Sequence, residues 1–376
     1  MVGRKLKVLG EAAKFDLCST CDKDRRYPDQ RGRWIYPAVL PDGERVFLLK
    51  VLMSNQCQNS CLYCVNRRGR EKENLSFTSE ELASLFWELY LQGKVKGLFL
   101  SSSTGEDLLK TLQSMLKTVE ILRCKYRFRG YIHLKVLPDS PFSYVKEAVK
   151  LAHRVSINLE APTPLHLSYI APEKNWKEIM KRIRWISHLS KKYSLPGGQV
   201  TQFVVGPGGE KDRDILSLTW QLYQDFGVKR VYYSAFQPVP HTPLSGYPPT
   251  SLLREHRLYQ ADFLLRKYGF SFKDIFFDEE GNLPLNLDPK LLWAINHPEF
   301  FPIEVNQASY EDLLRVPGIG PSSALRILKR RKVSKFLSGE ELKETGLWLE
   351  RASPFILVNG KRIEKLREEQ LPLITV

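Results

Sequence analysis

The stretch VFLLKVLMSNQCQNSCLYC, residues 46–64, joins a largely apolar run to three closely spaced cysteines. Residues 46–53 have the length and composition of a buried strand. The chain then enters a polar loop that contains Cys57, Cys61 and Cys64. We therefore predict a strand over residues 46–53 that leads directly into a cysteine loop.

Alternating strand and helix patterns continue from this loop to about residue 235. Thr78 and Glu81 form a capping-box pattern, and apolar residues repeat at helical spacing through Leu89 up to Gly93. The other expected strands are 97–100, 131–137, 155–159, 200–205 and 230–235, and the other expected helices are 106–124, 142–153, 174–193 and 211–226.

Six strands separated by helices predict an α/β fold with a parallel sheet and right-handed crossovers, here a partial (β/α)6 barrel. In such folds the chemistry lies at the carboxyl ends of the strands, which is where the cysteine loop begins. The expected domains are an irregular lead-in over 1–45, the core barrel over 46–240, a connecting helical and proline-rich segment over 241–300, and a small all-α domain over 301–376.

The three cysteines of the loop have the spacing CxxxCxxC. This spacing lets three thiolates converge on a [4Fe-4S] cubane and leaves one iron without a protein ligand. A zinc site made of Cys18, Cys21, Cys61 and Cys64 is the alternative, but it leaves Cys57 without a role. We therefore predict Cys57, Cys61 and Cys64 as the ligands of a catalytic cluster.

These residues resemble the radical S-adenosylmethionine (SAM) superfamily. The resemblance implies that the open iron binds the methionine portion of SAM and that an electron from the cluster cleaves the carbon–sulfur bond, which gives a 5′-deoxyadenosyl radical. Serines stand where the family often has a Gly-Gly-Glu run. The implied cofactor contacts are Tyr63 beside the adenine, Ser101, Ser102 and Ser103 near the methionine amino group, and Gly206 in the adenine-contact segment.

Polar residues also alternate along two of the expected strands. Ser156, Asn158 and Glu160 share one face, so we expect them to contact the ribose and sulfonium region of SAM. A partly exposed strand end is the alternative for these three. His133 and Lys135 likewise share a face, and they either reach SAM or substrate or are solvated at the strand end.

The stretch LLRVPGIGPSSALRI, residues 313–327, resembles a helix-hairpin-helix motif. Glycines allow the hairpin backbone to approach a phosphate closely, and the amides at the start of the next helix favour an anion. A protein-interaction or packing hairpin is the alternative. The predicted nucleic-acid contacts are Gly318, Gly320, Ser322, Lys329 and Arg330.

The charge balance of 57 Lys and Arg against 42 Asp and Glu gives a net charge of +15. This charge favours a polyanionic partner, although a basic host proteome would also explain it. Over nearly the whole chain the sequence resembles a bacterial family of radical SAM proteins associated with DNA modification or repair. We therefore predict a radical SAM enzyme that acts on nucleic acid, preferably DNA, with an electron donor such as a flavodoxin or ferredoxin. The alternatives are a tRNA-modifying radical SAM enzyme and a non-catalytic, zinc-containing DNA-binding protein.

The other three cysteines are Cys18, Cys21 and Cys124. They either hold part of a second cluster or are free thiols in a reducing compartment. The sequence has no apolar run of the roughly 20 residues that span a bilayer, so we expect a cytoplasmic protein without a membrane partner.

Overall fold

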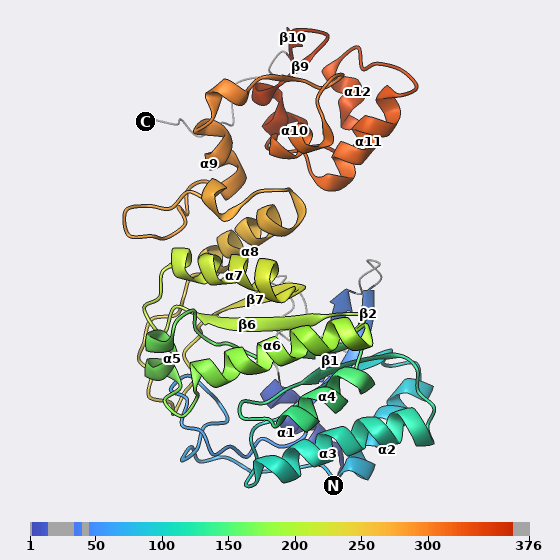
Figure 1. Cartoon of the computed structure of the whole chain (residues 1–376), viewed down its shortest axis with the longest axis vertical. Helices are drawn as coiled ribbons and strands as arrows, with labels where there is room; N and C mark the ends of the chain where they lie inside the picture. The colour runs from blue at the N-terminus through green and yellow to red at the C-terminus, as the bar shows by residue number, and fades with distance from the viewer. Residues whose placement is uncertain (1, 14–33, 40–44, 364–376) are drawn as a thin grey trace. The chain divides into compact units, whose positions relative to one another are not determined.

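The computed structural model describes residues 2–13, 34–39 and 45–363. The chain divides into two compact units, residues 1–255 and 256–376. The predicted barrel lies in the first unit and the predicted helix-hairpin-helix domain in the second. Figure 1 labels the elements of both.

The first unit contains a seven-stranded sheet whose spatial order follows the sequence, from β1 to β7. β1 pairs antiparallel with β2, and the strands from β2 to β7 are all parallel. The six predicted parallel strands are therefore confirmed. The strands are β1 (Ile35–Val39), β2 (Arg45–Leu52), β3 (Gly97–Ser101), β4 (Tyr131–Lys135), β5 (Arg154–Ser156), β6 (Gln199–Val205) and β7 (Arg230–Ala235).

Helices α2, α3, α4, α6 and α7 follow one another along one face of the sheet (Figure 1). The predicted capping box is present, because the Thr78 hydroxyl accepts from the Glu81 amide at 3.1 Å and the Glu81 carboxylate accepts from the Thr78 amide at 2.9 Å. The helices are α1 (Val2–Ala12), α2 (Ser79–Leu91), α3 (Leu108–Glu120) with the π-helical turn η3 (Ile121–Lys125), α4 (Phe142–Leu151), α5 (Pro164–Ile170), α6 (Trp176–Tyr193) and α7 (Asp212–Phe226).

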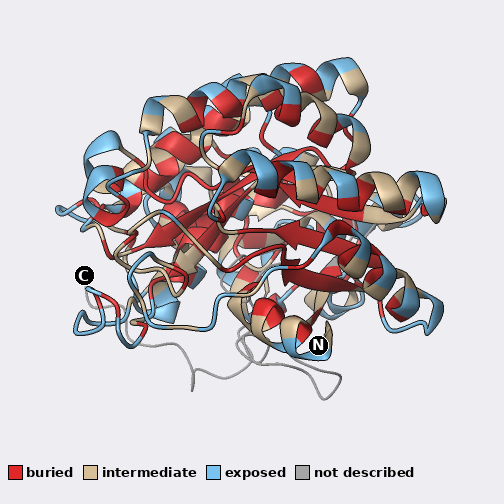
Figure 2. Cartoon of the chain, turned by 90° about the horizontal axis from the view of Figure 1, so that it is seen from below, coloured by how far each residue is buried: buried red, intermediate tan, exposed pale blue. Residues whose placement is uncertain are grey.

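The strands of this sheet are buried. Every residue of β3 and of β6 is buried, as expected for parallel strands that are covered on both faces. In Figure 2 the sheet is red, whereas the outer sides of the helices are pale blue. The core therefore lies between the sheet and the helices, which fixes the carboxyl ends of the strands at one edge.

The N-terminal segment is more regular than the sequence predicts. It contains α1, which packs against β2, and the strand β1. Pro37 lies within β1, and a proline in a run of residues argues against a central strand. The strand is possible because β1 is at the edge of the sheet, where one side of the backbone needs no ladder partner.

The second unit contains the two helices of the predicted hairpin motif, α10 (Tyr310–Arg315) and α11 (Pro321–Arg331). Their apolar residues form its core together with Phe336. A three-stranded sheet, which the sequence does not predict, accompanies the helices. The other elements are most of α8 (Leu252–Lys267), η4 (Phe272–Asp274), α9 (Pro289–Ile295), η5 (Pro298–Phe300), β8 (Ile303–Glu304), α12 (Gly339–Lys343), α13 (Leu349–Ala352), η6 (Ser353–Phe355), β9 (Ile356–Val358) and β10 (Lys361–Arg362).

Gly97, at the start of β3, leaves no room for a side chain. A Cβ atom there would lie 2.6 Å from the Tyr131 carbonyl oxygen and 2.8 Å from Leu48 Cδ2. We predict that Gly97→Ala lowers the free energy of unfolding by about 1–3 kcal/mol, because neighbouring strands must move apart. Gly3→Ala is the control, since a Cβ at Gly3 has open space around it. Equal melting temperatures for the two variants would contradict this account of the sheet.

Candidate functional site

A cavity of about 480 Å³ lies at the edge of the sheet where the parallel strands end. Its wall contains all three cysteines of the CxxxCxxC motif, residues that follow β3, β4, β5 and β7, and residues within β6. A cavity of this size fits a small molecule. The polar and cysteine residues that line it include Cys57, Asn59, Cys61, Tyr63, Cys64, Asn66, Ser102, Ser103, Thr104, Lys135, Asn158, Glu160, Lys174, Gln202 and Ser234.

The cysteine loop is fixed to two distant parts of the chain. Thr104, which follows β3, approaches Cys57 Sγ at 3.5 Å and accepts from the Gln58 amide at 2.9 Å. Ser60 donates to Glu173 through its backbone amide at 3.0 Å and its hydroxyl at 2.5 Å. The loop is therefore held in place by contacts outside itself, so that its thiols keep their position beside the cavity.

The three thiols have different surroundings. Burial raises the pKa of Cys61 to about 11 and that of Cys64 to about 12. The Asn66 backbone amide donates to Cys64 Sγ at 3.3 Å, an interaction that favours the thiolate. Metal ligation requires deprotonated thiols, so binding of iron supplies the charge compensation that the buried thiols lack.

The three cysteines match the donor set of an iron–sulfur cluster. Among residues 2–13, 34–39 and 45–363, no group of three or more His, Cys, Asp or Glu side chains forms a site for one metal ion. In a cubane each thiolate binds a different iron, so the thiols surround a larger object. Three cysteines on one cavity wall provide the donor set for three irons of such a cluster. The assignment of the individual ligands stays a prediction.

A buried ion pair crosses the cavity wall. Lys174 Nζ lies 2.7 Å from Glu160 Oε1, and the two side chains are only 10% and 7% exposed. Burial alone would lower the pKa of Lys174, but the Glu160 carboxylate raises it above its usual value. Glu160 also bonds to Tyr63, and burial raises the pKa of that phenol well above its ordinary range. The lysine therefore stays charged beside Glu160.

Glu160 occupies an unusual backbone conformation. Its φ angle is +66°, in the left-handed region that costs energy for residues other than glycine. Its backbone exchanges hydrogen bonds with the β6 strand, because its amide donates to Gln202 and its carbonyl accepts from Val204. The sheet thus imposes this conformation, which directs the carboxylate toward Lys174.

Several other predicted cofactor contacts also lie on the cavity. Tyr63, Ser102, Ser103, Asn158 and Glu160 all contribute to its wall. The hydroxyl of Ser102 donates to the Ser54 carbonyl at 3.3 Å, which ties the end of β3 to the segment after β2. The structure therefore brings these five together with the cysteines, and their contacts with SAM stay a prediction.

Three of the predicted cofactor contacts, Ser101, Ser156 and Gly206, are not part of the cavity wall. Ser101 is buried in the last position of β3. Ser156 bonds through its hydroxyl to His133 Nε2 at 2.8 Å, and the His133 ring stacks on Phe99 at 4.2 Å. Burial lowers the pKa of His133 well below its usual value, so the imidazole is neutral. These side chains form a polar part of the core.

Gly206 has a structural reason for being glycine. Its φ angle is +107°, and a Cβ atom there would collide with the Thr250 hydroxyl. Its amide donates to the Glu210 carboxylate, which also accepts from Gly208 at 3.1 Å. These contacts fix the turn after β6. Its neighbour Val204 lines the cavity, whereas Gly206 does not.

The sequence reasoning missed Lys174, Thr104, Gln202 and Ser234. Lys174 lies between α5 and α6 in a segment that has no recognisable motif. Gln202 and Ser234 lie within predicted strands. A polar side chain toward the carboxyl end of a buried strand is the sequence feature that could have indicated their place in the site. The cavity also includes Glu11 from α1.

The remaining cysteines are Cys18, Cys21 and Cys124, of which the structure describes Cys124. Cys18 and Cys21 lie outside the described residues, so the zinc alternative and the second cluster stay untested. Cys124 is exposed in the π-helical turn η3. A second cluster therefore stays a prediction that rests on the CxxC pair.

The hairpin motif in the second unit has the expected geometry. Gly318, in the turn between α10 and α11, has a φ angle of +86°, and Gly320 caps the start of α11. No side chain caps this end of α11, so the first amides of the helix are available to an anion. Ser322 is exposed in this first turn.

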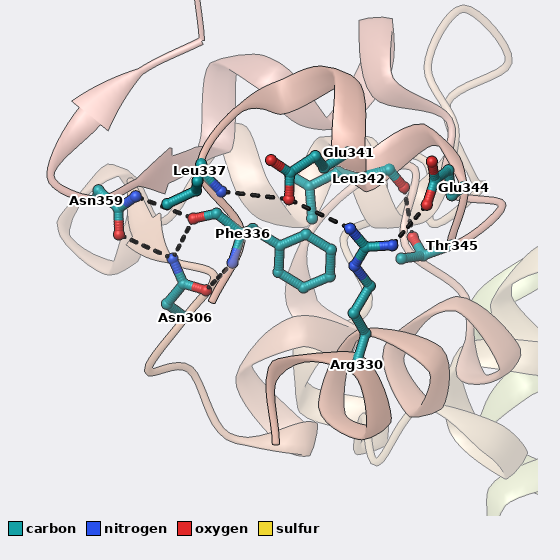
Figure 3. Close-up of polar contacts among 9 residues, drawn as sticks. All are labelled: Asn306, Arg330, Phe336, Leu337, Glu341, Leu342, Glu344, Thr345 and Asn359. Carbon is teal, nitrogen blue, oxygen red and sulfur yellow. Dashed lines mark hydrogen bonds and ion pairs between the residues drawn. The ribbon is translucent and has the colours of Figure 1, made fainter. Parts of the chain in front are cut away.

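The basic end of α11 is partly used within the domain itself. Arg330 pairs with Glu344 at 2.6 Å and with Glu341 at 3.4 Å (Figure 3). Arg331 donates to the carbonyl oxygens of two residues that precede α10. Lys329 is exposed. This geometry favours a structural role for Arg330 and leaves Lys329 as the better candidate for a phosphate contact.

Family comparisons agree with both parts of this architecture. The model described as Radical SAM superfamily matches residues 51–219, and the model described as Helix-hairpin-helix motif matches residues 300–346. The chain contains a radical SAM domain. Enzymes with this domain use a [4Fe-4S] cluster and SAM, so both predicted cofactors are confirmed at the level of the domain.

Individual proteins are similar to parts of this chain. The chain is 25% identical over 232 residues to the threonylcarbamoyladenosine tRNA methylthiotransferase MtaB of Thermotoga maritima. The matched region covers 60% of this chain and 52% of that protein. The chain thus spans about half the length of this curated relative. Two solved structures are also similar. A methylornithine synthase is 14% identical with a TM-score of 0.46, and the match covers 57% of this chain and 60% of that one. A radical SAM methyltransferase from Sphaerobacter thermophilus is 13% identical with a TM-score of 0.45, and the match covers 72% of this chain and 87% of that one. The likeness to DNA modification or repair proteins stays a prediction.

The helices give no sign of a membrane span. Within the described part of the chain, none combines the length and the apolar character needed to cross a bilayer.

Replacement of the cluster cysteines tests the ligand assignment. We predict that Cys57→Ala, Cys61→Ala and Cys64→Ala each remove most of the iron bound after anaerobic reconstitution, because each thiolate holds a different iron. Cys124→Ala is the matched control and should retain the iron, since Cys124 is exposed on η3. The measurement is the iron and sulfide content per chain. Full iron content in any of the three loop variants would contradict the assignment.

The buried ion pair between Glu160 and Lys174 leads to a prediction about the free energy of unfolding. Lys174→Met leaves the Glu160 carboxylate buried without its partner, so we expect a loss of about 3–5 kcal/mol in the free energy of unfolding. The double variant Glu160→Gln with Lys174→Met removes both charges and should recover most of this loss. Thermal unfolding of the metal-free protein measures both. A double variant no more stable than Lys174→Met would show that the pair is not coupled.

Proposed function

We propose that this radical SAM enzyme modifies or repairs nucleic acid, with DNA as the preferred substrate. The observation that carries the proposal is the presence in one chain of a radical SAM domain and a helix-hairpin-helix motif with an open helix N-terminus. The first supplies radical chemistry, and the second offers backbone amides to phosphate groups.

In the proposed site Cys57, Cys61 and Cys64 hold the cluster. When bound, the cluster supplies the electron that cleaves SAM, from which enzymes of this superfamily obtain a 5′-deoxyadenosyl radical. The Glu160–Lys174 pair presents a carboxylate and an ammonium to the same cavity. This arrangement is complementary to the methionine portion of SAM, whose ammonium and carboxylate carry opposite charges. The electron itself comes from an external donor such as a flavodoxin or ferredoxin.

The rest of the cavity wall supports binding of the nucleoside portion. Tyr63 and Val204 pack in one apolar cluster with Phe236 and supply a surface for a planar ring. Asn158 adds an amide that can donate to and accept from hydroxyl groups. The chain's own residues thus bind and orient SAM and exclude water from it.

Access to the cavity constrains the substrate. The cavity is concave, and a base paired inside a duplex cannot enter it. A nucleobase that reacts there must be flipped out or already unpaired. The net charge of +15 favours nucleic acid over uncharged substrates, since it attracts the phosphate backbone.

A tRNA-modifying enzyme is the second candidate. The similarity to a tRNA methylthiotransferase favours it, although that similarity covers about half of the relative. A hairpin that contacts phosphates carries no sequence or sugar preference by itself, so both polymers fit the motif. The order of preference rests on the wider resemblance to the DNA-associated family.

Turnover in the presence of competing polymers tests the proposal. The anaerobically reconstituted protein is incubated with SAM, a reductant and either single-stranded DNA, duplex DNA or tRNA, and 5′-deoxyadenosine is quantified. We expect DNA to increase its formation, and we expect mass spectrometry to find a product on the DNA. Stimulation by tRNA alone would favour the second candidate. A protein with zinc and no iron would support the non-catalytic alternative.

Salt dependence provides an independent check of the nucleic-acid interface. We expect the affinity for a DNA oligonucleotide to fall as salt rises, with a shallower dependence in Lys329→Ala than in the unchanged protein, because one phosphate contact is lost. Lys332→Ala, at an exposed lysine just beyond α11, is the comparison. An unchanged slope in Lys329→Ala would remove this residue from the interface.

A further inference from the structure

The described part of the hairpin domain exposes one large aromatic ring. Within residues 300–363 the exposed large apolar side chains are those of Leu325, Val333, Leu337 and Trp348. Trp348 is 60% exposed, although its neighbours Leu347 and Leu349 are buried. A tryptophan in this state presents a wide planar surface to solvent and needs an explanation.

The backbone of Trp348 is bonded directly to the hairpin. The Trp348 amide donates to the Gly318 carbonyl at 2.9 Å. A Cβ atom on Gly318 would lie 2.6 Å from the Trp348 carbonyl oxygen, so the two backbones are in close contact. The glycine that forms the hairpin turn therefore also allows the tryptophan to lie beside it.

Two further bonds align the segment before Trp348 with α11. Ser323 donates through its hydroxyl to the Gly346 carbonyl at 2.9 Å, and Arg326 donates to the Thr345 carbonyl at 3.0 Å. Both donors lie in the first two turns of α11. The segment of residues 345–348 thus runs along the same end of α11 that offers its amides to a phosphate.

The backbone of Trp348 is also anchored on its C-terminal side. Trp348 is the N-cap of α13, where Leu349 and Ala352 are buried in the core of the domain. The Arg351 guanidinium lies 5.5 Å from the Trp348 ring centroid and pairs with Asp288. The backbone of the tryptophan is therefore fixed, so binding of a partner needs no ordering of this segment.

We propose that Trp348 is a stacking platform for an unpaired base of the nucleic acid whose phosphate the hairpin binds. This inference rests on the proposed nucleic-acid function and specifies the substrate class as single-stranded or locally unpaired nucleic acid. Stacking on an aromatic ring tolerates every base, because each base has a π face. A paired base within a duplex hides its faces against its neighbours, so a regular duplex makes no use of the ring.

The position of the ring fits this partner. Each nucleotide carries its base close to its phosphate, and the hairpin and Trp348 are in backbone contact. The Arg351 guanidinium lies beside the ring and pairs with Asp288, so the exposed ring face is what this segment offers to a base. A nucleic acid can therefore use the hairpin for its backbone and the ring for a base.

Fluorescence anisotropy of three labelled probes tests the inference in the full chain. The probes are a short oligo-dT, an oligonucleotide of the same length made of abasic residues, and a regular duplex. We expect Trp348→Ala to weaken binding of oligo-dT by about 5- to 150-fold and to leave the abasic and duplex probes unchanged. Trp348→Phe keeps an aromatic face and should retain most of the affinity.

Val333→Ala is the matched control, because Val333 is an exposed apolar side chain of the same domain and should affect no probe. Equal loss on all three probes, or no loss on oligo-dT, would overturn the stacking role. Absence of a loss on oligo-dT would indicate that the exposed ring contacts a protein partner instead. Failure of the unchanged protein to bind any probe would instead refute the proposed nucleic-acid function.

Discussion

The parallel pairing of β2 to β7 is the constraint on which the rest of the first unit depends. It brings the carboxyl ends of six strands to one edge, although they are separated by more than 180 residues of sequence between Leu52 and Ala235. The cysteine loop follows the first of these strands, and the polar wall of the cavity comes from the other strands and from the residues that follow them. A change in pairing register would therefore disperse the whole site.

The site combines thiols with a buried pair of opposite charges. Desolvation disfavours ionisation of Cys61 and Cys64, whereas Lys174 stays charged because the Glu160 carboxyl lies 2.7 Å from it. The positive φ angle of Glu160 shows that the sheet maintains this arrangement against a backbone cost.

Much of this architecture follows from local sequence signals. Apolar runs and the Thr78 capping box predict the six strands and their helices, and the cysteine spacing predicts the cluster loop. Local signals fail where a feature depends on distant partners. Pro37 argues against a strand at its position, and β1 forms there because it lies at the edge of the sheet. Lys174 contributes to the site through its ion pair with Glu160, which no local pattern indicates. The exposed face of Trp348 likewise becomes meaningful only through its contact with Gly318.

The central claim is that the three loop cysteines hold a cluster with one iron open to SAM. Electron paramagnetic resonance of the anaerobically reconstituted, reduced protein tests it most directly. The account predicts the signal of a reduced [4Fe-4S] cluster and a clear change in that signal when SAM is added, because SAM binds the open iron. A cluster signal that SAM leaves unchanged, or a reconstituted protein without any cluster signal, would contradict it.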